Sequence, residues 1–235
     1  MSERTIEIGI VFFPGMTQLD VTGPFEVFAR LPNARVHLLW KRIEPIESDV
    51  GLRLMPTMTF ADCPDLDVLC VGGGPGQVNV MDDVELLTFL QNKGATARYV
   101  TSVCAGCLML AVAGLLDGYR SACHWLFIDQ LSAYGAIPSS DRVVIDRNRV
   151  SGAGVTAGVD FGFKVAALLC GEDVAKRLQL YLEYAPEPPF DLTVKNAPAE
   201  LLEDMRGAAG TAVEARVAAM KRAYLVAHSR KVEPV

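Results

Sequence analysis

Apolar residues along the chain fall into two alternating kinds of segment. Short runs rich in β-branched residues predict buried strands at 6–12, 36–40, 67–71 and 99–103. Longer segments between and after them are typical of helices, at 20–30, 82–93, 108–113, 154–169 and 172–184. Two further runs predict a hairpin, at 143–145 and 149–151. Because strands and helices alternate, we expect an α/β fold: a doubly wound, mostly parallel sheet with helices on both faces.

The C-terminal part has a different pattern. Residues 185–190 are rich in proline and predict an extended segment that ends the preceding helix. Residues 199–227 predict an amphipathic helix, with an apolar stripe of Met205, Ala208, Ala212 and Val213. The stripe either packs on its own domain or makes a subunit contact. With no repeat and no low-complexity linker, we expect one α/β domain over 1–195 and a helical extension of that domain over 196–235.

One strand-to-helix turn carries a cysteine. The run 99–103 ends at Cys104, small residues follow it, and a helical segment begins. A reactive side chain on such a sharp turn is a nucleophile elbow, similar to the G-x-S-x-G turn but with sulfur. The N-terminus of the helix favours a thiolate there, so we expect Cys104 to be the nucleophile.

A nucleophilic cysteine needs a proton donor or acceptor and a site for developing negative charge. Asp20 follows the first strand and is a candidate acid or base, with a helix N-cap as its competing role. The loop 72–76 is Gly-Gly-Gly-Pro-Gly and follows a strand, so its amides are candidates for an oxyanion hole. It is not a phosphate loop, because no Gly-Lys-Ser/Thr follows it.

A histidine and a second cysteine are further candidates for chemistry at the elbow. His124 is a possible accessory base, although a structural histidine is the competing interpretation. Cys104 and Cys107 form a C-x-x-C motif, which also occurs in dithiol redox proteins, while the apolar residues after Cys107 favour its inward packing. No Cys/His set has the paired spacing of a zinc site, so we expect no metal.

Composition narrows the function classes. The chain has 235 residues and a net charge of −6 without a basic cluster, which argues against nucleic acid as a partner. No apolar run approaches the ~20 residues of a membrane helix. The first residues lead directly into a strand and lack signal-peptide features, so we expect a cytoplasmic protein. Six cysteines in a chain of this length do not indicate a disulfide scaffold.

These motifs resemble the ThiJ/PfpI branch of the class I glutamine amidotransferase-like superfamily, and within it the isocyanide (isonitrile) hydratases. The resemblance covers nearly the whole chain. It is carried by the segments 13–14, 18–24, 60–64, 99–104, 124–125, 154–161, 182–186 and 188–190. The blocks near 154–161 and 182–190 discriminate most, because an elbow cysteine marks only the superfamily.

The resemblance implies a flavodoxin-like fold, a Cys104 nucleophile with Asp20 as its acidic partner, no cofactor, a small-molecule substrate and a homodimer. It also implies oxyanion or substrate contacts, from Gly73, Gly74, Ala105, Val155 and Thr156. The chain departs from the family pattern at three positions: Ala105 replaces a threonine, Gly72 replaces a proline, and Ala153 replaces a glycine. The missing hydroxyl at position 105 makes a change of substrate plausible.

Three functions follow as hypotheses. The first is a cofactor-free hydratase that converts isocyanides to N-substituted formamides through a cysteine thioimidate. The second is another thiol-dependent hydrolase or a glyoxalase-type enzyme. The third is a non-enzymatic ligand or oxidation sensor; only about 45 residues follow Phe190, which is too short for the paired helix-turn-helix module of related regulators.

Overall fold

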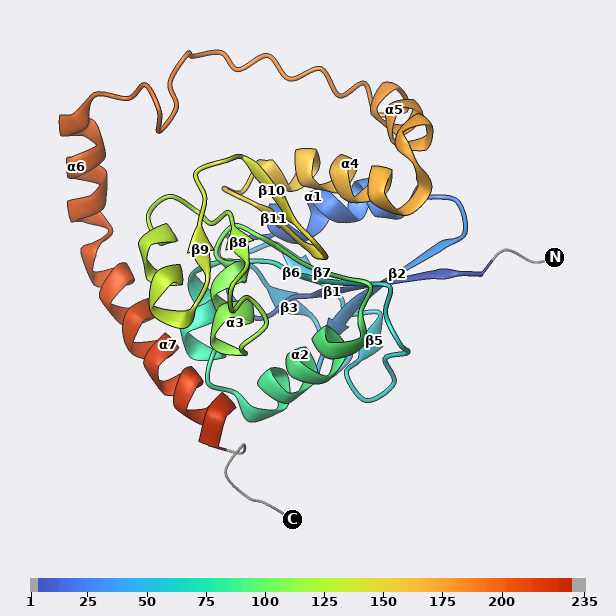
Figure 1. The fold of residues 1–235 in the computed structure, drawn as a ribbon, viewed down its shortest axis with the longest axis horizontal. Coiled ribbons are helices and arrows are strands. Elements are labelled where there is room, and N and C mark those ends of the chain that lie inside the picture. Colours follow the sequence, from blue (N-terminus) through green and yellow to red (C-terminus); the bar gives the residue numbers. More distant parts are fainter. Residues whose placement is uncertain (1–3, 230–235) are drawn as a thin grey trace.

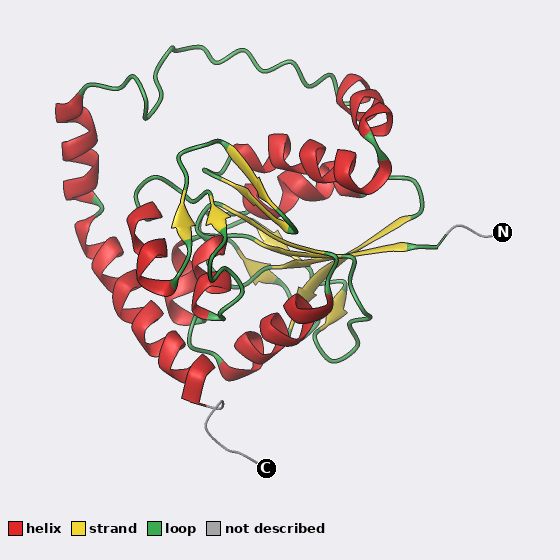
Figure 2. Ribbon diagram, in the orientation of Figure 1, coloured by secondary structure: helices red, strands yellow, loops and turns green. Residues whose placement is uncertain are grey.

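A seven-stranded sheet forms the centre of the computed structural model, which describes residues 4–229. The strand order is β10-β11-β7-β6-β1-β2-β5, and every pair is parallel except β10–β11 (Figure 2). The strands are β1 Ile6–Val11, β2 Ala34–Trp40, β5 Met58–Thr59, β6 Val68–Val71, β7 Tyr99–Val103, β10 Val143–Asp146 and β11 Arg149–Gly152. The predicted hairpin is confirmed as β10–β11.

Helices cover both faces of this sheet. One face carries α1 (Leu19–Phe28) and α4 (Ala157–Cys170), which pack on each other, and α5 (Glu172–Tyr181) lies beside α4 (Figure 1). The other face carries α2 (Val84–Thr96) and α3 (Gly106–Val112), and α7 (Gly210–Ser229) packs against both. The predicted α/β fold class is therefore confirmed. All four residues of β6 are buried, as expected for a central parallel strand.

Several short elements had no counterpart in the sequence prediction. They are β3 Ile46–Glu47, β4 Arg53–Leu54, β5 Met58–Thr59, β8 Arg120–Ser121, β9 Ile137–Pro138, and the 3₁₀ helices η1 Pro75–Asn79 and η2 Ile128–Tyr134. Each strand pair here has two residues per strand. Segments this short do not show a hydrophobic period.

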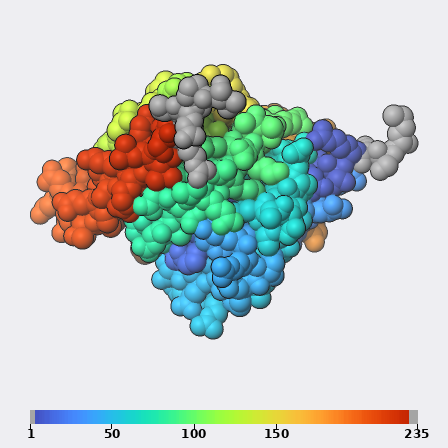
Figure 3. Space-filling model, turned by 90° about the horizontal axis from the view of Figure 1, so that it is seen from below, coloured from blue at the N-terminus to red at the C-terminus, as the bar shows by residue number. Residues whose placement is uncertain are grey.

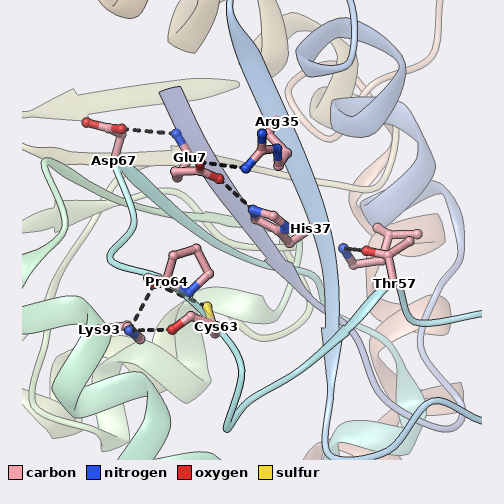
Figure 4. A network of polar contacts seen from close by, with 9 residues as sticks. Glu7, Arg35, His37, Thr57, Cys63, Pro64, Asp67 and Lys93 are labelled. Carbon is pink, nitrogen blue, oxygen red and sulfur yellow. Dashed lines mark hydrogen bonds and ion pairs between the residues drawn. The ribbon is translucent and has the colours of Figure 1, made fainter. Parts of the chain in front are cut away.

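A polar network lies where the central strands begin, at the edge opposite the elbow (Figure 4). His37 Nε2 lies 2.6 Å from Glu7 Oε2, and the Glu7 amide donates to Asp67 Oδ2 at 3.0 Å. Lys93 Nζ donates to the carbonyl of Cys63 at 3.0 Å. The Glu7 contacts join β1 to β2 and to the loop before β6, and Lys93 links α2 to the same loop.

The C-terminal part leaves the body of the molecule and returns to it. After α5, residues 182–198 run as an extended arm to α6 (Ala199–Ala208) (Figure 1). Helix α7, red in Figure 3, then packs on the body. The predicted single helix is thus two helices, which meet at Ala209. The predicted extension 196–235 continues beyond the described residues at 230–235, and the division of domains stays a prediction.

The predicted apolar stripe of the C-terminal helix is wrong. Met205, Ala208 and Ala212 are exposed, and α6 has no buried residue. The buried face lies further along α7 and comprises Arg216, Ala219, Met220, Ala223 and Ala227. The contact with the body therefore begins at Arg216, about one to three turns beyond the predicted stripe. Helix α7 packs on its own domain through a buried face that includes an arginine.

Candidate active site

The elbow is built by close backbone packing where β7 meets α3. Cys104 has a φ of 59°, in the left-handed region that non-glycine residues seldom adopt. A Cβ on Gly106 would overlap the Val71 carbonyl group, so only glycine fits after the turn. Cys104 is 5% exposed, and its amide donates to the Gly152 carbonyl at 3.1 Å. The turn therefore holds the cysteine in a strained and fixed position.

Asp20 approaches the elbow from the second position of α1. Its side chain is fully buried, and Oδ2 accepts a 2.8 Å hydrogen bond from the Gly73 amide. Oδ1 is also buried and has no hydrogen-bond partner. The N-cap of α1 is Gln18, so the capping role weighed for Asp20 is wrong. A buried carboxyl with one free oxygen remains for chemistry.

The glycine loop, residues 72–76, lies in direct contact with the elbow and with Asp20. A Cβ on Gly73 would lie 2.6 Å from the Ala105 amide nitrogen and 3.0 Å from Asp20 Oδ2. Gly74 has a φ of 135°, which side chains rarely allow, and it faces the backbone of residues 16–17. The loop needs glycine so that its backbone can reach the elbow. The Gly73 amide binds Asp20 there.

Burial raises the pKa values of both Cys104 and Asp20. For Asp20 the pKa rises to about 7, while the hydrogen bond from the Gly73 amide and the neighbouring Cys104 side chain act in the opposite direction. Burial, and then the charge of Asp20, raise the pKa of the Cys104 thiol well above its ordinary value. Burial thus opposes the thiolate that the N-terminus of α3, a helix of seven residues, is expected to favour. The buried thiol faces a carboxyl whose pKa lies near neutral pH.

A cavity of about 340 Å³ opens beside Cys104. It is lined by Thr17, Gly74, Pro75, Val78, Cys104, Ala105, His124, Phe127, Val155, Ala212, Ala215 and Arg216. The structure thus brings together Cys104, Gly74, Ala105, His124 and Val155 from the predicted site. Asp20 and Gly73 lie against the elbow behind this lining. The volume suits a small molecule.

Thr156 does not join this cavity. It is exposed, and its hydroxyl accepts a hydrogen bond from Arg142 Nη2 at 3.3 Å. It lines a separate hollow between α4 and the arm, together with Asp160 and Tyr184. Thr156 is the N-cap residue of α4, and the residue before it, Val155, does line the cavity beside Cys104.

His124 lies at the cavity with its ring half-buried. Burial, and then the charge of Arg216, lower its pKa. Its Nδ1 accepts from the Leu126 amide at 3.4 Å, and its own amide donates to the Cys104 carbonyl at 3.4 Å. The ring is therefore neutral at working pH, and the residue supports the elbow through its backbone.

Cys107 is fully buried, and its thiol donates to the Cys104 carbonyl at 3.4 Å. None of the six cysteines forms a disulfide bond. Within residues 4–229, no group of three or more His, Cys, Asp or Glu side chains is arranged to hold a metal ion. In the same part of the chain, no helix is both long and apolar enough to cross a membrane.

Arg216 was missed by the sequence analysis. It comes from α7, is 3% exposed and lines the cavity with Cys104. The sequence did hold a signal: residues 216, 219, 220, 223 and 227 have helical spacing, and all but the first are apolar. A charged residue on an apolar face is an informative exception.

Comparison with known proteins identifies the family. Residues 7–168 match the family model described as DJ-1/PfpI family. The chain belongs to the DJ-1/PfpI family. The similarity inferred from the elbow, the segment 18–24 and the later blocks is thereby confirmed.

Two members of the family are similar over nearly the full length. The isonitrile hydratase of Pseudomonas putida is 48% identical over 219 residues, which cover 93% of this chain and 96% of that protein. A ThiJ/PfpI family protein from Pseudomonas syringae has a crystal structure that superposes with a TM-score of 0.89 at 42% identity, covering 92% of this chain and 90% of the other. A transcriptional regulator of Pseudomonas aeruginosa, GbdR, is 37% identical over 112 residues, but these make up 30% of its length.

Proposed function

We propose that this protein is an isocyanide hydratase, which adds water to R–NC to give the formamide R–NH–CHO. The observation that carries the proposal is the 48% identity to an isonitrile hydratase over 93% of the chain. The site supports the same chemistry, because a buried thiol lines a cavity for a small molecule and a buried carboxyl with a pKa of about 7 lies behind that thiol. Water and the isocyanide supply every atom of the product, so the overall reaction needs no co-substrate.

The first step forms a thioimidate. The Cys104 sulfur attacks the terminal carbon of the isocyanide while its proton passes to Asp20. Asp20 then returns that proton to the same carbon, which gives R–N=CH–S–Cys104. The Ala105 amide lowers the thiol pKa through its hydrogen bond, and so stabilises sulfur as the proton leaves. A carboxyl serves as both base and acid when its pKa lies near the working pH, as burial arranges for Asp20.

The second step releases the formamide. Asp20 takes a proton from a water molecule, whose oxygen bonds to the thioimidate carbon. The nitrogen receives that proton, and the carbon–sulfur bond breaks as the hydroxyl proton returns to sulfur through Asp20. Gly74 and the Ala105 amide are our candidates for contact with the polar intermediate, and Val155 is our candidate for contact with the substituent. We do not carry Thr156 into the mechanism, because it lies outside this cavity.

The test is formamide production. Purified protein is mixed with cyclohexyl isocyanide, and N-cyclohexylformamide is measured by chromatography. The wild type should form it, and Cys104→Ala should abolish turnover. Cys63→Ala is the matched control: it removes a buried thiol near Lys93, and it should leave turnover unchanged. A Cys104→Ala variant that still makes the formamide at the wild-type rate would sink the mechanism.

We also propose that the protein acts as a cytoplasmic homodimer. The arm and its flanks expose large apolar side chains, namely Leu180, Tyr181, Phe190, Leu192 and Val194. Exposed apolar groups clustered on one segment are typical of a contact surface. Light scattering coupled to gel filtration tests the oligomeric state, and a mass of one chain at micromolar concentration would contradict the proposal.

A further inference from the structure

Helix α7 places a buried arginine in the wall of the active-site cavity. Arg216 lies on the face of α7 that packs against the body, and it is 3% exposed. The cavity that it lines also contains Cys104 and Ala105. The arginine therefore comes from the C-terminal helix, far along the chain from the elbow, and meets the space that the substrate enters.

The guanidinium group has neutral partners. Its Nη2 donates to the Gly74 carbonyl at 2.8 Å, and its central carbon lies 4.0 Å from the centre of the Phe127 ring. Its Nε is buried and has no hydrogen-bond partner. Within residues 4–229, no carboxylate lies within ion-pair distance of Arg216. The carbonyl and the ring orient the group without neutralising its charge.

An arginine in this position keeps its charge at any working pH. A buried charge is normally paired, because its removal from water is costly. The side chains that line the cavity include no carboxylate. Burial also raises the pKa of the Cys104 thiol, which disfavours a thiolate as the partner of Arg216. The unpaired Nε and the net positive charge therefore indicate that a ligand supplies the negative group.

We propose that the preferred substrates are isocyanides that carry a carboxylate, which binds the Arg216 guanidinium while the isocyanide carbon meets the Cys104 sulfur. The proposal rests on the hydratase function and adds a substrate class to it. A guanidinium forms charge-assisted, forked hydrogen bonds with a carboxylate, so Arg216 selects by charge as well as by size. Arg216 would then be a specificity residue that also orients the substituent away from the elbow.

The competing role for Arg216 is structural: its bond to Gly74 fastens the glycine loop to α7. The two roles differ in their dependence on substrate charge. A fastening role lowers the turnover of charged and neutral substrates together, whereas a binding role changes their ratio. The ratio is therefore the quantity to measure.

The first experiment compares isocyanoacetate with its uncharged methyl ester as substrates. The wild type should have a kcat/KM at least about tenfold higher for isocyanoacetate, the size expected for one charge-assisted contact. Arg216→Met should lose this preference, and Arg216→Lys should keep part of it. Arg222→Met is the matched control: Arg222 lies on the same helix, is exposed and pairs with Asp82, so its loss should leave the ratio unchanged.

The second experiment does not require hydratase activity. Iodoacetate and iodoacetamide are nearly the same size and differ in charge, and both alkylate thiols. Their rates at Cys104 are measured by peptide mass spectrometry, with the iodoacetate-to-iodoacetamide ratio normalised to that of glutathione. The normalised ratio should exceed one in the wild type and fall about tenfold in Arg216→Met, while Arg222→Met should match the wild type.

These outcomes separate the inference from the function. If no isocyanide reacts but the alkylation ratio behaves as described, the hydratase proposal fails and the anion site stands. The inference is overturned if the wild type favours the methyl ester and its alkylation ratio is no higher than that of glutathione. This outcome needs only the wild type, so it holds even if Arg216→Met does not fold. Equal losses on charged and neutral reagents in Arg216→Met also overturn it, because they indicate fastening alone.

Discussion

The elbow and the C-terminal arm differ in what determines their structure. At the elbow, the backbones of residues 71–73 and 104–106 touch so closely that Gly73 and Gly106 leave no space for a Cβ. In the arm, residues 182–198 have no regular structure, and Phe190 is 79% exposed. The elbow is fixed by contacts within the chain, whereas the arm exposes apolar side chains to solvent.

The contrast suggests that the elbow serves catalysis and that the arm serves association between subunits. A thiol and a carboxyl that share a proton need fixed positions, because small displacements change proton transfer greatly. A surface that contacts another molecule needs exposed apolar groups and tolerates change within them. Substitutions at the elbow should therefore alter turnover, and substitutions in the arm should alter association. The predictions below test that division, from the largest effect to the smallest.

Asp20→Asn should cause the largest loss of turnover among the residues beside the cysteine. The change keeps the size of the side chain and removes its proton transfer, so kcat should fall by roughly 10²–10⁴-fold. Asp83→Asn is the matched control, because Asp83 caps α2 through the Leu86 amide and lies away from the elbow. Steady-state rates on cyclohexyl isocyanide measure both, and near-native turnover of Asp20→Asn would contradict the acid–base role.

The same carboxyl should make stability depend on pH. The pKa of Asp20 is about 7 in the folded protein, above its ordinary value of 3.8, so the folded state binds more protons between these values. Its contribution to stability is therefore full below about pH 4 and is lost as the pH rises through about 7. Asp20→Asn should remove this dependence. Between pH 4 and pH 8, its free energy of unfolding should therefore rise relative to that of the wild type by up to about 4 kcal/mol.

Urea unfolding of both proteins at several pH values measures this difference. Cooperative transitions are needed at each pH, so that the free energies of unfolding are comparable. A gap between variant and wild type that stays constant from pH 4 to pH 8 would show that the Asp20 pKa is not raised.

Ala105→Thr should have a smaller effect. Ala105 lines the cavity and is 1% exposed, and the resemblance places a threonine at this position. If a hydroxyl there contacts the substrate, its return is worth about 0.5–1.5 kcal/mol, or several-fold to about tenfold in isocyanide turnover. The rate and the structure of the variant are needed together. A threonine that fits, forms its hydrogen bond and leaves the rate unchanged would argue against isocyanides as substrates.

The arm should give the smallest change in turnover. Phe190→Ser should leave the rate unchanged and shift the dimer toward monomer, since it removes a large apolar side chain from the proposed contact. Val50→Ser is the matched control, because Val50 is 78% exposed and lies outside the arm. Gel filtration with light scattering measures the shift. If Phe190→Ser keeps the mass of the wild type but loses turnover, the arm serves catalysis and not association, which contradicts the account.

The sequence revealed the local features and missed those that depend on distant packing. The strands of four or more residues and the elbow at Cys104 were predicted, because continuous apolar runs and a strand-to-helix turn are local patterns. The rise in the pKa of Cys104 was not predicted, since burial depends on the whole fold. The contact between Asp20 and Gly73 spans 53 positions. Arg216 reaches Gly74 across 142 positions, and its role in the cavity could not be placed by spacing alone.

The most direct test of the central claim is the mass of Cys104 during turnover. The protein is mixed with cyclohexyl isocyanide, quenched in acid within milliseconds to seconds, and digested for mass spectrometry. We predict that the peptide with Cys104 gains the full mass of the isocyanide, because a thioimidate forms by addition without a leaving group. The adduct should accumulate in Asp20→Asn if release is slowed more than formation. Formamide production with no adduct on Cys104 in either protein, and at the wild-type rate in Cys104→Ala, would contradict the account.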